Sequence, residues 1–345
     1  MTSRIAVPLA AACAALVTLL AAPAFAQTQP QTQPLEKFTF ALNWFAVGDH
    51  AAYWVALDKG YYAQRGLDVK IEASKGSGDS IAKVDTGRAD AGLADAVPII
   101  SAVSRGAKVK IVGMVFDKTP MTFFSRIDTP LLKPADLEGK TLGAPAGDSQ
   151  RLAFPAFARL NKIDPSKVSW VNIEPTAKQA AIAEKRVDGV ADYTTGLPFY
   201  DKAMGGPGKV ARLAWSDYGF DLYAMAIMAG EKTMADKPKQ LKAFLEASYM
   251  GWRDVMANPK EALEIYKKRV PEIDPGIIEA NMLLGFELMR TRTYADSGIG
   301  FIDEKKMCGS TDIVNTYMGL PKKVDCKAVY TTDYFTKVAM PLSVK

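Results

Sequence analysis

The sequence has few of the residue types that bind metal ions, and its net charge is small. Its 345 residues include one histidine and three cysteines, and the formal net charge is only +5 at pH 7. A structural zinc ion needs four ligands, usually cysteine and histidine, so this composition predicts no metal site. Lysine and arginine are spread along the chain rather than clustered, so no nucleic-acid partner is indicated.

Sequence motifs of known catalytic machinery are also missing. The chain contains no G-x-S-x-G motif, no G-x-G-x-x-G motif and no Walker sequence before GKT at 139–141. The residues SIAK at 80–83 match S-x-x-K, but no S-D-N or K-T-G accompanies them, so we interpret them as a helix turn. We therefore predict that the protein is not an enzyme and uses no cofactor.

Long apolar runs are confined to the N-terminus. Arg4 precedes an apolar, alanine-rich run at 9–20, and AFA at 24–26 has the small-x-small pattern of a cleavage site. We predict a signal peptide over residues 1–26, cleaved after Ala26, and hence a periplasmic protein. An uncleaved membrane anchor is the alternative, which the short apolar run disfavours. Two copies of QTQP then predict a flexible tether over 27–36.

The cysteines indicate a single crosslink. Cys13 lies in the predicted signal peptide, which leaves Cys308 and Cys326 in the mature chain. An isolated pair in an oxidising compartment predicts one disulfide, and two buried free thiols are the alternative.

Alternating strand-like and helix-like segments indicate an α/β fold. The strand-like runs are at residues 37–44, 67–74, 109–116, 139–145 and 168–175. The helix-like segments between them are at residues 51–59, 80–86, 97–105, 147–160 and 177–185. The first three of these helices each end before a glycine, which is a common helix stop.

The pattern repeats, which favours two similar lobes over one large sheet. RADAGLAD at 88–95 and RVDGVAD at 186–192 both stand where a helix gives way to a strand. A further strand-like passage, LYAMAIMAG at 222–230, is followed by helices to about residue 290. This order predicts a discontinuous first lobe with a second lobe inserted into it. The predicted bounds are 37–122 and 219–345 for lobe 1, and 123–218 for lobe 2.

The loops after the predicted strands carry polar and aromatic side chains. Open α/β sheets bind ligands beyond the carboxyl ends of their strands, where loops lead into helix N-termini. We therefore predict ligand-binding residues in these loops. The candidates are Asn43, Trp44, His50, Gly76, Ser77, Asp79 and Asp95 in the first lobe, and Asp148, Ser149, Gln150, Asp192 and Tyr193 in the second. KGSGDS at 75–80 suits either close approach by a ligand or a tight turn.

Several of these segments resemble the periplasmic solute-binding proteins of ABC importers. They are LNWFAVGDHAAYWVALDKGYYAQRGLDV at 42–69, KGSGDS at 75–80, GRADAGLAD at 87–95 and GAKVKIVGMV at 106–115. Within that group the sequence is similar to the branch of thiamine-pyrimidine-precursor binders and the related pyrimidine synthases, with sulfonate, taurine and nitrate binders as cousins. The resemblance runs from Lys37 to about Gly230 and is strongest before Val115.

The resemblance implies a periplasmic-binding-protein fold of type II, in which two α/β lobes hinge around a ligand cleft. It also implies no catalysis in the importer members and a transient partnership with a membrane permease. We expect a monomer that captures a small, largely neutral aromatic or N-heterocyclic compound. The acids Asp79, Asp95, Asp148 and Asp192 suit hydrogen-bond donors on such a ligand, although some of them will serve only as helix caps.

Two departures from the resembling families bear on the alternatives. The chain lacks the cysteine-rich motif of the synthases, which disfavours a secreted enzyme with His50 as its reactive residue. Sulfonate and nitrate binders usually open the second-lobe helix with glycine followed by serine or threonine, whereas Asp148 stands here. An aspartate there caps the helix but repels an anion, which disfavours an anion receptor. Arg151 could offset part of this repulsion.

The single histidine lies in ALNWFAVGDHAAYW at 41–54, where a strand gives way to a helix. At a helix start the partial positive charge disfavours an imidazolium ion, so we predict a neutral His50 ring. His50 either contacts the ligand in the cleft or has a structural role in the first helical turn. We predict that His50→Ala weakens ligand binding by about 1–3 kcal/mol and changes the stability of the unliganded protein less.

Overall fold

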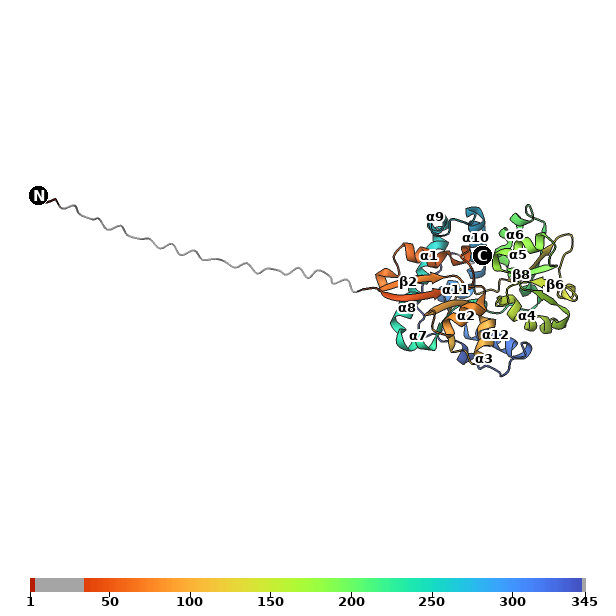
Figure 1. Ribbon diagram of the computed structural model, residues 1–345. Coiled ribbons are helices and arrows are strands. Elements are labelled where there is room, and N and C mark those ends of the chain that lie inside the picture. Colours follow the sequence, from red (N-terminus) through yellow and green to blue (C-terminus); the bar gives the residue numbers. More distant parts are fainter. Residues whose placement is uncertain (4–33, 343–345) are drawn as a thin grey trace. The chain divides into compact units, whose positions relative to one another are not determined.

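Two five-stranded mixed sheets organise the part of the chain that the computed structural model describes, residues 1–3 and 34–342 (Figure 1). Residues Leu35–Lys345 form one folded unit. The predicted signal peptide with its cleavage after Ala26, and most of the predicted tether, lie in 4–33, outside the described residues. Within the described part, no helix is both long and apolar enough to cross a membrane.

The first sheet has the strand order β2-β1-β3-β10-β4. Its strands are β1 (Glu36–Ala41), β2 (Leu67–Glu72), β3 (Ala91–Asp95), β4 (Val109–Met114) and β10 (Met225–Gly230). β1 pairs in parallel with β2 and β3, while β10 runs antiparallel between β3 and β4. β3 and β10 are buried along their whole length, which matches their almost continuous apolar sequence.

The second sheet repeats this arrangement, with the order β7-β6-β8-β5-β9. Its strands are β5 (Met121–Arg126), β6 (Thr141–Gly143), β7 (Ser169–Val171), β8 (Gly189–Tyr193) and β9 (Val210–Ala214). Here β5 is the antiparallel strand, and it lies between β8 and β9. The chain passes from the first sheet to the second before β5 and returns before β10. The fold is therefore α/β with two lobes, as the sequence predicts.

Helices complete each lobe. Lobe 1 comprises the first sheet and the helices α1 (Ala51–Asp58), α2 (Ser77–Asp85), α3 (Ala96–Ser104), α7 (Glu231–Asp236), α8 (Pro238–Ala257), α9 (Pro259–Arg269), α10 (Pro275–Met289), α11 (Arg292–Ser297), α12 (Glu304–Tyr317) and α13 (Cys326–Val329). Lobe 2 comprises the second sheet and the helices α4 (Ser149–Leu160), α5 (Lys178–Ala183) and α6 (Leu197–Ala203). In Figure 1 the lobe 2 elements are the yellow-green and green ones.

Local sequence signals explain where the later helices begin. Asn258 and Asp274 accept hydrogen bonds from the backbone N–H groups of Glu261 and Gly276, and a proline follows each of them at the first helical position. Helix α8 buries an apolar stripe, within which Phe244 stacks between Phe38 and Tyr62 at ring-centroid distances of 4.7 and 5.4 Å. The helical spacing of its apolar residues places this stripe in the core.

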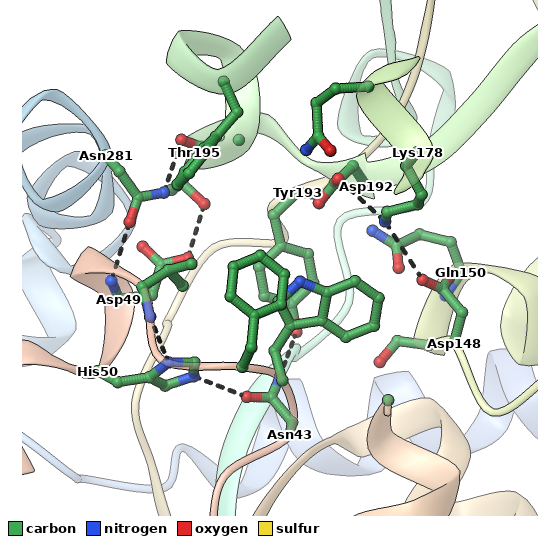
Figure 2. A pocket seen from close by; sticks show the side chains of 18 residues that line it. Asn43, Asp49, His50, Asp148, Gln150, Lys178, Asp192, Tyr193, Thr195 and Asn281 are labelled. Atoms are coloured by element: carbon green, nitrogen blue, oxygen red, sulfur yellow. Dashed lines mark hydrogen bonds and ion pairs between the residues drawn. The ribbon is translucent and has the colours of Figure 1, made fainter. Parts of the chain in front are cut away.

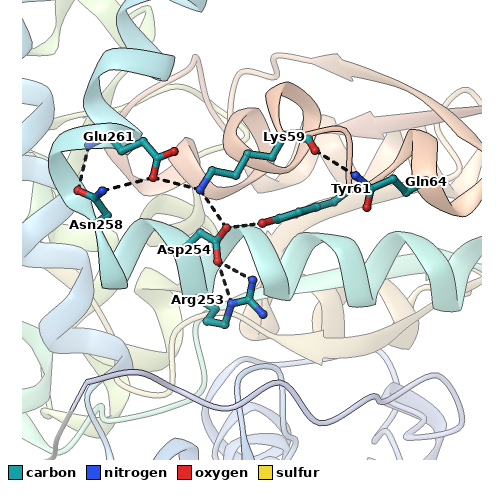
Figure 3. A network of polar contacts seen from close by, with 7 residues as sticks. All are labelled: Lys59, Tyr61, Gln64, Arg253, Asp254, Asn258 and Glu261. Carbon is teal, nitrogen blue, oxygen red and sulfur yellow. Dashed lines mark hydrogen bonds and ion pairs between the residues drawn. The ribbon is translucent and has the colours of Figure 1, made fainter.

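A polar network on the surface fixes α1 against α8 and α9 (Figure 3). Asp254 accepts hydrogen bonds from Tyr61 and from Lys59, whose Nζ lies 3.1 Å from the carboxylate. Lys59 also reaches Glu261 in α9, again at 3.1 Å. These contacts hold the C-terminal end of α1 against α8 and α9.

The disulfide prediction is confirmed, since Cys308 in α12 is bonded to Cys326 at the start of α13. Helix α12 packs against α3 of lobe 1 and α4 of lobe 2. The crosslink therefore ties the C-terminal segment to a helix that contacts both lobes.

The two lobes touch one another along the loops that follow β2 and β6. Ser77 Oγ lies 2.6 Å from Ser149 Oγ, and the Gly78 N–H donates to the Gly147 carbonyl at 3.0 Å. A Cβ atom at Gly76 would lie 2.3 Å from the Gly147 oxygen, and the φ of +121° also favours glycine there. The small residues of KGSGDS thus permit close approach of the other lobe's backbone.

Candidate functional site

A cavity of about 50 Å³ lies between the two lobes (Figure 2). Most of the predicted ligand-binding residues line it. These are Asn43, Trp44, His50, Gly76, Asp148, Ser149, Gln150, Asp192 and Tyr193. The predicted loops of both sheets therefore meet at one place, although their contact with a ligand stays a prediction. A volume of this size has room for a few water molecules.

His50 and Asn43 form a neutral hydrogen-bonded chain in lobe 1. His50 Nδ1 accepts from the Val47 N–H at 3.3 Å, and its Nε2 donates to Asn43 Oδ1 at 3.0 Å. The Asn43 amide then donates to the Tyr193 hydroxyl of lobe 2 at 3.3 Å. The Tyr193 hydroxyl in turn donates to Asp95 Oδ1 at 2.7 Å. Each member thereby fixes the orientation of the next across the cleft.

The geometry of His50 supports a neutral ring. Its imidazole accepts at one nitrogen and donates at the other, and burial lowers the pKa of His50 to about 3. Both ring nitrogens are engaged within the protein, so only the ring face and edge carbons are left to meet a ligand. His50 acts on the cavity mainly by orienting Asn43.

Asp49 is a buried acid that sequence reasoning did not select. It lies in the 3₁₀ turn Gly48–His50, and its side chain accepts from Thr195 Oγ1 of lobe 2 at 2.7 Å. Asn281 in α10 accepts from the Asp49 N–H at 3.1 Å and donates to the Thr195 carbonyl at 2.7 Å. Burial raises the pKa of Asp49 to about 7. No cation lies within ion-pair distance of Asp49 in the described part of the chain.

A charged cluster forms the lobe 2 wall. The Lys178 ammonium donates to the Ala191 carbonyl at 2.6 Å and pairs with Asp192 at 2.9 Å and Asp148 at 3.6 Å. It also lies 4.5 Å from the centroid of the Trp44 ring in lobe 1, which is a cation–π contact. Lys178 is only 1% exposed. The indole face that the sequence suggested for a ligand is thus covered by a lysine in this arrangement of the lobes.

The Asp148 side chain caps the N-terminus of α4. Its Oδ1 accepts from the backbone N–H groups of Gln150 and Arg151 at 3.0 and 3.2 Å. Arg151 donates to the Ala144 carbonyl and stands over the Trp170 ring, and it does not line the cavity. The expectation that Arg151 could offset the aspartate's repulsion of an anion is therefore wrong.

Three predicted site residues lie outside the cavity lining. Ser77 bonds Ser149 and the Asp95 N–H, so it belongs to the contact between the lobes. Asp95 is fully buried behind Tyr193, and burial raises its pKa to about 6. Asp79 pairs with Lys83 at 3.2 Å and lines a wider groove between the lobes. Phe45 lines both this groove and the cavity. Each of these side chains serves the scaffold in this structure.

The cavity also contains residues that the sequence did not reveal. They are Phe45, Val47, Asp49, Lys178, Gln179, Thr195, Gly196, Phe199 and Asn281. Phe45, Val47 and Asp49 lie inside the stretch that contains His50, so the strand-to-helix junction was a signal for them. Lys178 and Asn281 sit on helices with no distinguishing local pattern. Within the described residues, no group of three or more histidine, cysteine, aspartate and glutamate side chains could hold a metal ion.

Comparison with known protein families gives a match over most of the folded region. The family model described as "NMT1/THI5 like" matches residues 47–262. This span includes both lobes' contributions to the cavity apart from Asn43, Trp44, Phe45 and Asn281.

Curated relatives include binding proteins and enzymes. The chain is 25% identical over 329 residues to a riboflavin-binding protein of Chloroflexus aurantiacus, covering 92% of this chain and 91% of that protein. It is 25% identical over 254 residues to a formylaminopyrimidine-binding protein of Halalkalibacterium halodurans, covering 72% and 76%. A 4-amino-5-hydroxymethyl-2-methylpyrimidine phosphate synthase of Schizosaccharomyces pombe is 24% identical over 247 residues, covering 67% and 68%.

Solved structures show the same fold. The alkanesulfonate-binding protein SsuA of Xanthomonas axonopodis pv. citri matches with a TM-score of 0.66 and 15% identity, covering 86% of this chain and 99% of that one. The nitrate-binding protein NrtA of Synechocystis PCC 6803 matches with a TM-score of 0.63 and 15% identity, covering 87% of each chain. At such identities the match establishes the fold and leaves the ligand open.

Proposed function

The chain belongs to the NMT1/THI5-like family, and we propose that it is the extracytoplasmic solute receptor of an ABC importer. Its ligand is a small aromatic or N-heterocyclic compound, in the class of pyrimidines and flavins. The ligand enters when the lobes move apart, because side chains of both lobes line the present cavity and narrow it. Closure of the lobes then buries it against side chains from both.

One observation carries this choice of ligand class: neither the helix N-terminus at the cavity nor its lysine is free to bind an anion. The α4 N–H groups are occupied by Asp148, and Lys178 is occupied by Ala191, Asp192 and Asp148. Asp49 also lines the cavity, and no residue of the described part of the chain serves as its counter-ion. Such a lining repels a sulfonate or nitrate ion and favours hydrogen-bond donors on a ligand.

The aromatic side chains of the cavity suit a flat ligand. Trp44, Phe45 and Phe199 line it together with Tyr193. Aromatic rings bury a large area and stack on one another in offset or edge-to-face arrangements. The named ligands of two relatives, riboflavin and a formylaminopyrimidine, are flat heterocycles as well.

We further propose that the protein is a receptor and not a synthase. The synthase relatives leave an enzyme as the competing function, with His50 as its reactive residue. In this chain both imidazole nitrogens are hydrogen-bonded inside lobe 1, and the sequence lacks the cysteine-rich motif of the synthases. Export through the predicted signal peptide and a transient contact with a membrane permease complete the proposal.

A thermal-shift screen of the mature protein tests the function. The panel contains riboflavin, 4-amino-5-hydroxymethyl-2-methylpyrimidine, cytosine, aromatic amines, taurine, sulfate and nitrate. A ligand present at a hundred times its Kd adds about 2.7 kcal/mol to the free energy of unfolding. We expect a heterocycle to raise the Tm and the anions to leave it unchanged. A response to taurine or nitrate alone would refute the proposal.

The same samples separate the receptor from the enzyme. After incubation with the stabilising heterocycle, the intact mass of the protein and the amount of free compound are measured. A receptor leaves both unchanged. A loss of mass localised to His50, or conversion of the compound, would show that the chain is a synthase.

A further inference from the structure

Two fully buried polar atoms of cavity-lining side chains have no hydrogen-bond partner in the described structure. They are Asp49 Oδ1 of lobe 1 and Gln150 Nε2 of lobe 2. Asp49 is 4% exposed and Gln150 2% exposed. Buried polar groups in folded proteins are almost always hydrogen-bonded, so two unpartnered groups in one cavity point to a ligand that completes them.

Asp49 differs from the other acids of the site. Asp148 and Asp192 share Lys178. Asp148 also accepts from the α4 N–H groups, and Asp192 also accepts from the Tyr193 backbone N–H and the Tyr200 hydroxyl. Asp95 also has an unpartnered oxygen, but it lies behind Tyr193 and does not line the cavity. Asp49 is therefore the cavity acid whose charge and second oxygen are left uncompensated.

Gln150 provides the complementary group. Its backbone N–H is held by Asp148 in the first turn of α4, which fixes the residue while leaving its side chain to face the cavity. An amide offers both a donor and an acceptor. In the view of Figure 2, Asp49 and Gln150 lie on opposite sides of Tyr193, with the rings of the cavity between them.

We propose that Asp49 and Gln150 recognise two opposite edges of one planar heterocycle. One edge carries an N–H donor, neutral or protonated, which binds Asp49 Oδ1. The other edge carries an acceptor, a carbonyl oxygen or ring nitrogen, which binds the Gln150 amide. This inference rests on the proposed function and specifies its ligand. Because the two groups belong to different lobes, the ligand that satisfies both also holds the lobes together.

The test uses probes in which the N–H donor is present or blocked. Riboflavin is compared with 3-methylriboflavin, and 4-amino-5-hydroxymethyl-2-methylpyrimidine with its 4-dimethylamino analogue, by calorimetric titration of the mature protein. A hydrogen bond to a charged group predicts that methylation weakens binding of the recognised parent by roughly 10- to 100-fold. This arm needs no variant and cannot be confused with misfolding. A parent and analogue of equal affinity would overturn the inference.

Variants assign the loss to the two residues. Asp49→Asn keeps the size of the side chain and removes the carboxylate, and Gln150→Met keeps its length and removes the amide. We expect each to weaken binding of the parent by roughly 10-fold or more. The methylated analogue should bind Asp49→Asn no worse than it binds the wild type. The matched controls are Asp58→Asn, whose carboxylate pairs with Arg269 on the surface, and Gln64→Met, which bonds Lys59.

The outcomes separate this inference from the proposed function. If the wild type binds a heterocycle but Asp49→Asn and Gln150→Met bind it equally well, the recognition scheme is wrong and the receptor function stands. If the wild type binds only taurine or nitrate, both are wrong. Thermal unfolding of each variant without ligand confirms that a loss of binding is not a loss of the fold.

Discussion

The buried polar groups of the two cleft walls have different kinds of partner. The lobe 1 wall uses a neutral chain in which His50 orients Asn43, and it leaves one acid, Asp49, without a counter-ion. The lobe 2 wall gathers charges and balances them with one lysine, which binds Asp148, Asp192 and a backbone carbonyl. The first wall is thus hydrogen-bonded and acidic. The second is ionic, and its charged groups are satisfied among themselves.

This difference assigns separate tasks to the walls. The lobe 2 cluster is completed by its own residues, so it contributes stability whether or not a ligand is bound. Asp49 reaches Thr195 of lobe 2 with one oxygen and has no partner for the other, so its state depends on lobe closure and on the ligand. Substitutions within the Lys178 cluster should therefore act mainly on folding, whereas substitutions of Asp49 should also act on binding.

The largest effect is expected for Lys178→Met. Removing the ammonium leaves Asp148 and Asp192 buried without their cation, and breaking a buried ion pair costs about 3–5 kcal/mol. Urea unfolding of the unliganded protein measures this loss. Lys239→Met at an exposed position is the control, and Lys178→Met combined with Asp192→Asn should recover part of the stability. A loss below about 1 kcal/mol would contradict the assignment of the Lys178 cluster to folding.

Asp49→Asn should change how stability depends on pH. The pKa of Asp49 is about 7 in the folded protein against 3.8 as its ordinary value. The folded state therefore holds a proton that the unfolded state has lost, and wild-type stability falls as the pH rises from about 4 to about 7. Relative to the wild type, the variant should gain up to about 4 kcal/mol between pH 4 and pH 8. A pH-independent difference between the two proteins would show that Asp49 stays ionised throughout.

The disulfide should affect stability and leave the cleft unchanged. Cys308 and Cys326 are separated by 18 residues, and closing a loop of that length contributes about 3 kcal/mol in the chain-entropy model. The double variant Cys308→Ser/Cys326→Ser should unfold at a lower urea concentration and bind its ligand with wild-type affinity. Weaker binding would mean that the C-terminal segment contributes to the cleft.

His50→Ala tests the lobe 1 wall with the smallest expected effect. Loss of the ring frees Asn43 to rotate, and we expect ligand binding to weaken by about 1–3 kcal/mol. Because His50 is fully buried, the variant should also lose stability without ligand. From the sequence we predict that this loss is smaller than the loss of binding. Calorimetric titration of His50→Ala and Asn43→Ala measures the loss of binding, and urea unfolding measures the loss of stability. Because the two residues act as one unit, the double variant should lose little more affinity than either single variant.

The sequence predicts the fold and one part of the site for physical reasons that are local. Alternating apolar residues locate the strands, and glycines mark the ends of several helices. Asn258 and Asp274 mark the beginnings of two helices as N-cap residues. Asn43, Asp192 and Tyr193 were found because strand ends gather at one edge of a sheet. These signals depend on neighbours in the chain.

The rest of the site depends on contacts between the lobes, which no local pattern encodes. Lys178 begins a helix as a surface lysine would, and only the fold shows that it is buried between two acids and Trp44. Asn281 meets Asp49 from 232 residues away. From the sequence, Gly76 fits a ligand-binding loop as well as it fits a tight turn. Only the structure shows that the Gly147 backbone of the other lobe lies against it.

A reversible lock between the lobes tests most directly whether the cleft must open to admit its ligand. Ser77 Oγ and Ser149 Oγ lie 2.6 Å apart across the lobes, so Ser77→Cys/Ser149→Cys should form a disulfide in the arrangement described here. Binding and release of riboflavin and 4-amino-5-hydroxymethyl-2-methylpyrimidine are followed with the double variant oxidised and reduced, beside both single variants. We predict that the oxidised protein takes up neither probe, retains a probe loaded before oxidation, and recovers exchange on reduction. Exchange by the oxidised double variant at the rate of the single variants would contradict a binding site enclosed between hinged lobes.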